Sequence, residues 1–235
     1  MNKTIYLEDT PKKKFIRQMF DDISQNYDLL NRVISFGLDG FCRKKTIVPH
    51  EQDSVALDIC SGSGDMSIEL LNRDNFNGII ILGDFSFKMH RLARQKLGGR
   101  KNVYYVCCDA ENLPFKDSSF DGIINGYSLR NLDDLRAFGS EIHRILKPGG
   151  HSSIVEVAHP PNKIIAWVFY LYFYKLIPII SRLFTKKKYA YHYLPFSLST
   201  FLKQAEVIKS LKGERLEGHY EGILLGAVAV YRLRK

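Results

Sequence analysis

Cysteine and tryptophan are scarce in this sequence, with four cysteines and one tryptophan among 235 residues. The cysteines lack the C-x-x-C or Cys/His spacing of a zinc site, so we expect no bound metal and no disulfide framework. Nothing at the N-terminus has the form of a signal peptide, and free thiols fit a protein of the reducing cytoplasm. Repeats and biased segments are also missing, which excludes a disordered chain and indicates one domain with a packed core.

Long apolar runs are missing too. The most apolar stretch, residues 164–174, contains 11 uncharged residues and is followed by Lys175 and Pro178. A membrane-spanning helix needs about 20 such residues, so the stretch predicts no transmembrane helix. A net charge is likewise missing from residues 1–160, which hold 21 basic and 21 acidic residues, whereas residues 161–235 hold 13 basic and 4 acidic ones. The whole positive excess therefore lies in the last third of the chain.

Alternating strand and helix patterns follow residue 50. Five apolar runs predict strands, at residues 54–59, 78–84, 103–107, 120–125 and 152–157. Helical spacing predicts helices at residues 65–71, 86–97 and 133–146, a Pro-Gly-Gly stop at 147–150, short amphipathic helices within 15–38, and a final strand at 222–232. This alternation indicates an α/β fold with a mainly parallel sheet, helices on both faces and ligands at the carboxyl ends of the strands.

Small residues follow the first predicted strand. Gly62 and Gly64 let the backbone turn sharply and approach a ligand closely. The dinucleotide pattern G-x-G-x-x-G is incomplete, because Ser67 stands in place of the third glycine. Asp58, just before the turn, would repel a phosphate and suits a cationic amino-acid group, reached through water or neighbouring amides. Pyrophosphate binding is therefore disfavoured at this turn.

Two further acids end the next two strands. Asp84, twenty residues beyond Gly64, stands where a carboxylate accepts hydrogen bonds from both ribose hydroxyls. Asp109 can accept a hydrogen bond from the adenine amino group while Ala110 covers the ring. Three acids at successive strand ends, with no phosphate-binding lysine or arginine between them, favour S-adenosylmethionine over NAD or ATP. The simpler alternative is that all three are solvated turn residues.

Several segments carry a family resemblance. They lie at residues 19–31, 35–38, 43–45, 109–115, 129–131, 146–150 and 191–197, with Phe201 and Gln204 following. Together they resemble the ubiquinone/menaquinone biosynthesis C-methyltransferases, a family of class I methyltransferases, over nearly the whole chain. The resemblance implies a single Rossmann-like domain over residues 1–235 with a seven-stranded sheet. Its parts are a helical cap (1–50), a cofactor-binding core (51–160), an apolar and basic helical segment (161–200), and a C-terminal helix and strands (201–235).

The resemblance also implies roles for individual residues. Ser63 stands where the family has a threonine on the cofactor, and Asp84 holds the ribose. Asp109 and Ala110 meet the adenine, and Gly126 occupies a place where family members often carry serine. Departures from the family pattern, which leave the exact quinone open, are Cys42 for tryptophan, Ser128 for glycine, His192 for arginine, and residues 222–226 for Asn-Leu-Thr-Gly-Gly.

The implied reaction is methyl transfer to a ring carbon of a prenylated quinol, demethylmenaquinol or a ubiquinone precursor. The ring carbon becomes a good nucleophile only when the neighbouring phenol loses its proton, so a cation or base is needed at the strand ends. We predict Arg130 as the stabiliser of the phenolate and Tyr191 or His192 as base or positioning group. The alternatives are that Arg130 only pairs with an acid such as Asp133 or Asp134, and that Tyr191 only packs.

Residues 161–188 allow two interpretations. Their apolar and aromatic side chains beside three lysines suit peripheral contact with an anionic membrane at the inner face of the cell membrane, where a prenylated quinol resides. Alternatively, they form a lid whose aromatic residues line a tunnel for the isoprenoid tail. An exposed apolar segment would also permit a homodimer.

Three other functions remain open. Basic charge would suit RNA, but residues 125–128 lack the Asn/Asp-Pro-Pro-aromatic motif, and no Pro-Cys nucleophile is present, so we expect no nucleic-acid substrate. The altered segment 222–226 would permit a soluble small-molecule acceptor. A non-catalytic protein that binds S-adenosylmethionine is the third alternative.

Overall fold

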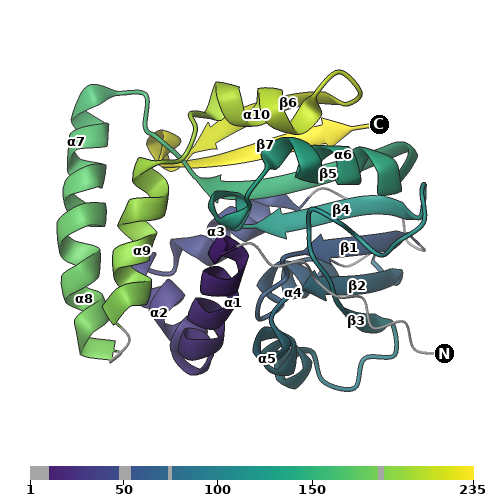
Figure 1. Ribbon diagram of the computed structural model, residues 1–235, viewed down its shortest axis with the longest axis horizontal. Helices are drawn as coiled ribbons and strands as arrows, with labels where there is room; N and C mark the ends of the chain where they lie inside the picture. Colours follow the sequence, from purple (N-terminus) through teal and green to yellow (C-terminus); the bar gives the residue numbers. More distant parts are fainter. Residues whose placement is uncertain (1–10, 48–53, 74–75, 185–187) are drawn as a thin grey trace.

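The computed structural model describes residues 11–47, 54–73, 76–184 and 188–235. One sheet has the strand order β3-β2-β1-β4-β5-β7-β6 (Figure 1). The first five strands run parallel, β7 runs antiparallel to β5, and β6 runs antiparallel to β7. The strands are β1 (Val55–Ile59), β2 (Ile79–Asp84), β3 (Val103–Cys107), β4 (Phe120–Gly126), β5 (Leu146–Val157), β6 (Glu217–Ile223) and β7 (Val228–Arg234). The predicted α/β fold with a mainly parallel, seven-stranded sheet is confirmed.

Helices cover both faces of this sheet, because successive strand residues point to opposite sides. Leu57 of β1 and Ile123 of β4 belong to a buried cluster on the face covered by α6 and α10. Ala56 and Ile124, their neighbours in sequence, belong to a second cluster on the face covered by α3, α4 and α5. The covering helices are α3 (Leu38–Thr46), α4 (Asp65–Leu71), α5 (Phe87–Leu97), α6 (Leu135–Ile145) and α10 (Gln204–Lys212).

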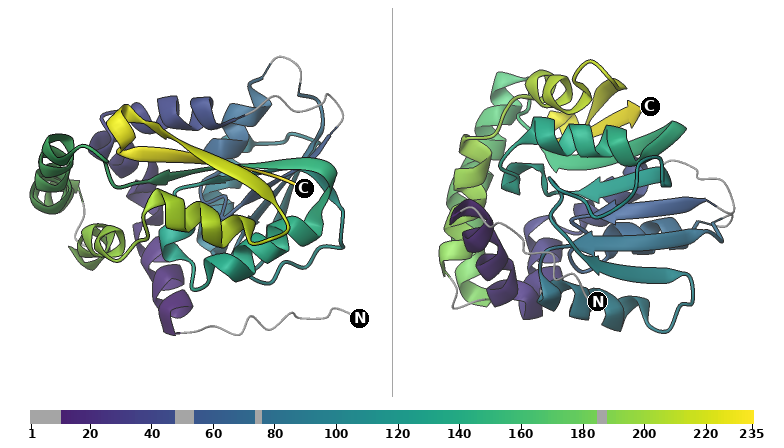
Figure 2. Two further views of the ribbon diagram at one scale, coloured as in Figure 1. Left: turned by 90° about the horizontal axis from the view of Figure 1, so that it is seen from above. Right: turned by 45° about the vertical axis from the view of Figure 1, so that its right-hand side comes forward.

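A helical cap lies across the carboxyl ends of the strands (Figure 2). It consists of α1 (Pro11–Ile23), a 3-10 turn (Ser24–Asn26), α2 (Tyr27–Ile34) and α3. Each turn that follows β1, β2 and β3 makes a polar contact with this cap: Ser63 with Asp28 at 2.6 Å, Ser86 with Asp21 at 2.5 Å, and Asp109 with Lys13 at 2.5 Å. The cap is therefore fastened to the edge of the sheet where ligands bind in this class of fold.

A long helix forms the outermost layer in Figure 1, beyond α9 (Lys188–Ser199) and the cap. It runs through α7 (Lys163–Leu171), a π-helical turn (Tyr172–Leu176) and α8 (Ile177–Phe184). Pro178 lies inside this helix and does not end it, because the widened π turn just before the proline accommodates its ring. Residues 163–180 thereby form one helix that is long and apolar enough to cross a membrane by length and composition alone, which is weak evidence for a span.

Two predicted strand boundaries are also wrong. β5 begins at Leu146 because Leu146 pairs with Phe120, and the predicted stop at 147–150 bonds to the backbone of Lys235 instead of leaving the sheet. The predicted final strand at 222–232 is divided between the end of β6 and β7. Leu224 and Leu225, with φ of +50° and +58°, reverse the chain between the two strands.

Candidate active site

Two cavities lie at the carboxyl edge of the sheet. The turn cavity, of about 60 Å³, is lined by α1 and by the turns after β1, β2, β3 and β4. The apolar cavity, of about 400 Å³, is lined mainly by apolar side chains of the cap, the α7–α8 helix and α9. Four residues line both cavities: Phe20, Tyr27, Tyr127 and Asn131. A group bound in one cavity would therefore lie against a wall of the other.

Five of the eight predicted cofactor residues line the turn cavity: Gly62, Asp84, Asp109, Ala110 and Gly126. They come together because the carboxyl ends of parallel strands meet at one edge of the sheet. A side chain added at Gly62 would meet no atom within 4 Å, so the backbone there faces open space. The direct contact of these residues with a cofactor stays a prediction.

Asp84 holds the glycine turn in place. Its Oδ2 accepts a hydrogen bond from the Gly62 N–H at 2.8 Å, and its Oδ1 accepts one from the Ser86 N–H at 2.8 Å. Burial raises the pKa of Asp84, and the two N–H groups oppose that shift by stabilising the carboxylate. The carboxylate therefore combines a structural bond to the turn with a place on the cavity wall.

The other three predicted cofactor residues do not line the turn cavity. Asp58 is fully buried below the turn, where its Oδ2 accepts hydrogen bonds from the Ser67 N–H at 3.1 Å and the Ser67 hydroxyl at 2.6 Å. Ser63 donates its hydroxyl to Asp28 on the cap. At Gly64, with φ of +86°, a side chain would come within 3.1 Å of Leu97. All three shape the turn, and whether they also contact a cofactor stays a prediction.

The pH dependence of stability should show that the buried Asp58 carboxyl is protonated in the folded chain. Burial raises its pKa to about 7, and hydrogen bonds from Ser67 only partly offset the shift. The folded chain thus keeps a proton that the unfolded chain releases near pH 4, so stabilisation that is complete below pH 4 is lost as the pH rises to 7. When the pH is raised from 4.5 to 7.5, the unmodified chain should lose about 3 kcal/mol of unfolding free energy that the Asp58→Asn variant keeps. Urea unfolding at both pH values measures the difference, and a pH-independent difference would contradict the buried, protonated carboxyl.

Lys13 is a cavity residue that no sequence motif indicated. Its ammonium lies 2.5 Å from Asp109 and 2.7 Å from Glu111, and all three side chains line the turn cavity. It sits in a run of three lysines, which in sequence looks like a solvated helix face. The ammonium of Lys13 therefore already occupies Oδ2 of Asp109, the carboxylate predicted to meet the adenine amino group.

Arg130 lies in the apolar cavity beside a buried acid. Its Nε donates to Glu156 Oε1 at 2.9 Å and its backbone N–H donates to Glu156 Oε2 at 3.3 Å. Arg130 does pair with an acid, as the alternative interpretation expected, but that acid is Glu156 near the end of β5 and not Asp133 or Asp134. The side chains of Arg130 and Glu156 are 6% and 0% exposed, and Arg130 Nη1 is buried without a hydrogen-bond partner in the described part of the chain. A buried guanidinium with an N–H that lacks an acceptor can donate a hydrogen bond to an anionic or polar ligand atom.

The remaining two predicted catalytic residues, Tyr191 and His192, lie in α9, and their side chains fall outside the described part of the structure. Their neighbour Tyr193 lines the apolar cavity and donates its hydroxyl to Asn131 at 3.2 Å. Burial raises the pKa of Tyr193 to about 12, so this phenol is a hydrogen-bond donor and not a base near neutral pH. Sequence reasoning passed over Tyr193, since its only signal was its place in the late family segment.

Comparison with known proteins settles the family. Residues 8–235 match the sequence model of the ubiE/COQ5 methyltransferase family. The chain belongs to this family. A demethylmenaquinone methyltransferase of Staphylococcus epidermidis is 34% identical over 96% of this chain and 95% of its own length. A protein of Geotalea daltonii named ubiquinone/menaquinone biosynthesis C-methyltransferase UbiE is 34% identical over 94% of this chain and 97% of its own length.

Solved structures agree on the fold. An S-adenosylmethionine-dependent methyltransferase of Thermotoga maritima aligns with a TM-score of 0.66 at 20% identity, over 94% of this chain and 99% of that one. One from Aquifex aeolicus aligns with a TM-score of 0.60 at 16% identity, over 96% and 99%. The predicted family is confirmed, and the chain is an S-adenosylmethionine-dependent methyltransferase.

Proposed function

We propose that this methyltransferase methylates a ring carbon of a prenylated quinol, with demethylmenaquinol as the first choice and a ubiquinone precursor as the second. The names of the two relatives support this acceptor class. The observation that carries the proposal is the apolar cavity itself. It is large, it adjoins the turn cavity, and it contains the buried Arg130 among apolar side chains. An aromatic ring with an oxygen and a long hydrocarbon tail matches that combination.

The cofactor would bind in the turn cavity. Asp84 would accept hydrogen bonds from the ribose, Asp109 would bind the adenine amino group, and Ala110 would cover the ring. Gly62 and Gly126 would allow the ligand close to the backbone, while Ser63, Gly64 and Asp58 hold the turn in shape. The buried carboxylate of Asp84 and the open space above Gly62 fit a nucleoside with a zwitterionic chain.

Arg130 would stabilise the phenolate of the acceptor. S-adenosylmethionine, when bound, supplies an electrophilic methyl group on a sulfonium. Glu156 fixes the Arg130 guanidinium through Nε, which leaves Nη1 available for the acceptor oxygen. The apolar lining of the cavity would keep the dielectric constant around the pair low, and this would strengthen the attraction between guanidinium and phenolate. Tyr191 or His192 would take the proton or position the ring, and apolar side chains of α2 and the α7–α8 helix would hold the tail.

Methyl transfer from labelled S-adenosylmethionine tests the proposal. The acceptors are a reduced demethylmenaquinone analogue, a demethoxyubiquinone-type precursor and total tRNA, with mass analysis of the product. Label on a quinol ring carbon supports the proposal and identifies the ring. Label only on RNA contradicts it. No label, in a protein that binds the cofactor tightly, would favour a soluble small-molecule acceptor.

The α7–α8 helix supports both earlier interpretations of its segment. Its inner side chains Phe169, Phe173 and Ile177 line the apolar cavity. Its outer side chains Ile164 and Trp167 are 75% and 67% exposed. We propose that the outer face rests on an anionic membrane surface, with the exposed Lys163 and Lys175 near the headgroups, while the inner face receives the tail.

Trp167, the single tryptophan of the chain, reports on this contact. Its emission should shift to shorter wavelength when phosphatidylglycerol vesicles are added, and less with phosphatidylcholine, because each basic residue near an anionic surface contributes about 1 kcal/mol. The double variant Ile164→Asp/Ile179→Asp should abolish the shift. Phe87→Asp, at an equally exposed position on α5, should leave it unchanged. A shift that grows with protein concentration without lipid would indicate a homodimer instead, and no shift at all would exclude the membrane contact.

A further inference from the structure

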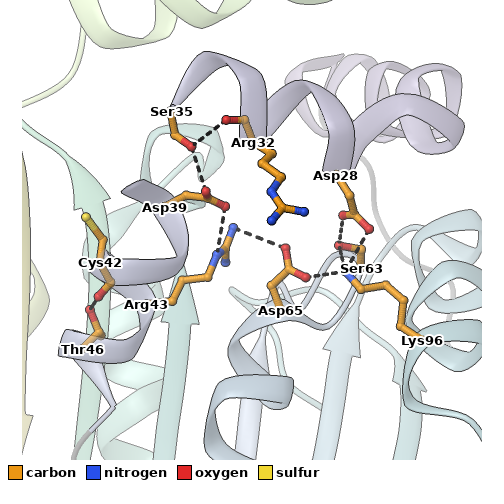
Figure 3. Close-up of polar contacts among 10 residues, drawn as sticks. All are labelled: Asp28, Arg32, Ser35, Asp39, Cys42, Arg43, Thr46, Ser63, Asp65 and Lys96. Carbon is orange, nitrogen blue, oxygen red and sulfur yellow. Dashed lines mark hydrogen bonds and ion pairs between the residues drawn. The ribbon is translucent and has the colours of Figure 1, made fainter. Parts of the chain in front are cut away.

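Arg43 is a buried cation whose N–H groups are incompletely hydrogen-bonded. It lies on α3, is 6% exposed, and faces Asp39 and Asp65 (Figure 3). Its Nε lies 3.8 Å from Asp39 Oδ2, and its Nη2 lies 3.7 Å from Asp65 Oδ2. Both distances exceed those of hydrogen bonds, and Nε is buried without a hydrogen-bond partner in the described residues. The N–H groups of a buried guanidinium are normally hydrogen-bonded, so Arg43 can donate to one more acceptor.

The two nearby carboxylates already serve other donors. Asp39 accepts a hydrogen bond from the Ser35 hydroxyl at 2.7 Å, and Asp65 forms an ion pair with Lys96 (Figure 3). They hold the Arg43 guanidinium in position by charge at a distance, and they leave its N–H groups available. The ring of Tyr127, 5.1 Å from the Arg43 guanidinium carbon, supports the cation from one side.

Arg43 lies where the two cavities meet. A side chain at Gly126 would come within 3.0 Å of Arg43 Nη1, so the guanidinium lies behind the end of β4, whose Gly126 lines the turn cavity. Asp65, the first residue of α4, follows directly on the glycine turn after β1. Arg43 also lines the apolar cavity. Its position is therefore the junction between the turn after β1 and the end of β4.

The strand order gives the order of the cofactor's parts, if the proposed function is right. Asp109 follows β3 and would bind the adenine, and Asp84 ends β2 and would bind the ribose. The next positions along the sheet are β1 and β4, so the amino-acid end would lie there, beside Arg43. The α-carboxylate is the one anionic group of S-adenosylmethionine. We infer that Arg43 binds this carboxylate and so anchors the amino-acid end of the cofactor.

Two ligands that differ by this carboxylate test the inference. They are S-adenosylhomocysteine and its decarboxylated form, in which the chain ends in a 3-aminopropyl group, and their dissociation constants are measured by calorimetry. The unmodified protein should bind S-adenosylhomocysteine about 10- to 100-fold more tightly, the effect of one or two charge-assisted hydrogen bonds. Arg43→Met should bind the two ligands about equally, because only the carboxylate loses its partner. Lys44→Met, at an exposed position on the same helix, should keep the full preference.

The outcomes separate this inference from the proposed function. If the unmodified protein binds neither ligand, the proposed cofactor site itself is wrong. If it binds both and Arg43→Met keeps the preference for the carboxylate, or weakens both ligands equally, the inference on Arg43 is wrong and the function stands. A higher KM for the quinol with unchanged cofactor binding would also overturn it, since Arg43 would then act on the acceptor. Arg43→Lys, which keeps the charge and loses the planar fork, should show a partial loss of preference, so the comparison remains available if Arg43→Met folds poorly.

Discussion

Arg130→Met should lose about 3–5 kcal/mol of unfolding free energy, because Glu156 would remain buried with an uncompensated charge. It should also lose turnover by about 10²- to 10³-fold, the usual effect of removing one donor that stabilises a developing anion. Binding of S-adenosylhomocysteine should be unchanged, since Arg130 lines the apolar cavity and not the turn cavity. Chemical unfolding, steady-state rates and calorimetry measure the three quantities.

The double variant Arg130→Met/Glu156→Gln separates fold from chemistry. Neutralising Glu156 removes the unpaired charge, so most of the lost stability should return. Turnover should stay low, because no cation has been restored to the apolar cavity. If Arg130→Met turns over at the unmodified rate, Arg130 has no part in the reaction. If the double variant recovers turnover with stability, Arg130 acts only through the fold.

Asp84→Ala should weaken S-adenosylhomocysteine binding by about 100-fold or more. Two hydrogen bonds from ribose hydroxyls to a carboxylate contribute about 1.5–3 kcal/mol each. The same change removes the acceptor of the Gly62 and Ser86 N–H groups, so the glycine turn would also lose the hydrogen bonds that hold its conformation. Asp84→Asn, which keeps one acceptor oxygen, should lose less. Calorimetry on the three proteins gives the order of affinities.

A ligand without the 2′-hydroxyl identifies the ribose contact. The unmodified protein should bind 2′-deoxy-S-adenosylhomocysteine more weakly than the parent ligand, whereas Asp84→Ala should bind both alike. Asp117→Ala removes an aspartate that is 77% exposed, pairs with Arg144 and lines neither cavity, and this variant should behave as the unmodified protein. If the missing 2′-hydroxyl weakens binding to Asp84→Ala as much as binding to the unmodified protein, the ribose does not contact Asp84.

Local sequence patterns predict most of the sheet and its turns. Residues 103–107 and 65–71 were predicted with their observed bounds, because each element's apolar spacing is a property of its own residues. The place of Asp84 and Asp109 on the wall of the turn cavity was predicted for the same reason, because parallel strands bring the residues that follow them to one edge of the sheet. Boundaries that depend on a distant partner were not predicted: β5 begins at Leu146 because this residue pairs with Phe120. The helical conformation of Pro178 was not predicted either, because it depends on a widened turn that the apolar pattern does not indicate.

The position of the helical cap over the sheet could not be predicted from the sequence. Lys13, Tyr27 and Arg43 line the cavities, yet their helices are amphipathic pieces whose placement over the strand ends no local pattern gives. Likewise, the partner of Arg130 was sought among the acids next to it in sequence, and Glu156 comes from the neighbouring strand in space. Residues that act across elements become visible only when the sheet order brings the elements together.

The wall shared by the two cavities has a thermodynamic consequence. Phe20, Tyr27, Tyr127 and Asn131 line both cavities, so a ligand in one would fix side chains that a ligand in the other must also contact. The two ligands are then linked by a coupling free energy, and linkage requires that each change the affinity of the other by the same factor. An acceptor affinity measured on the empty protein therefore differs from the one that governs turnover, by the factor that an acceptor analogue imposes on S-adenosylhomocysteine.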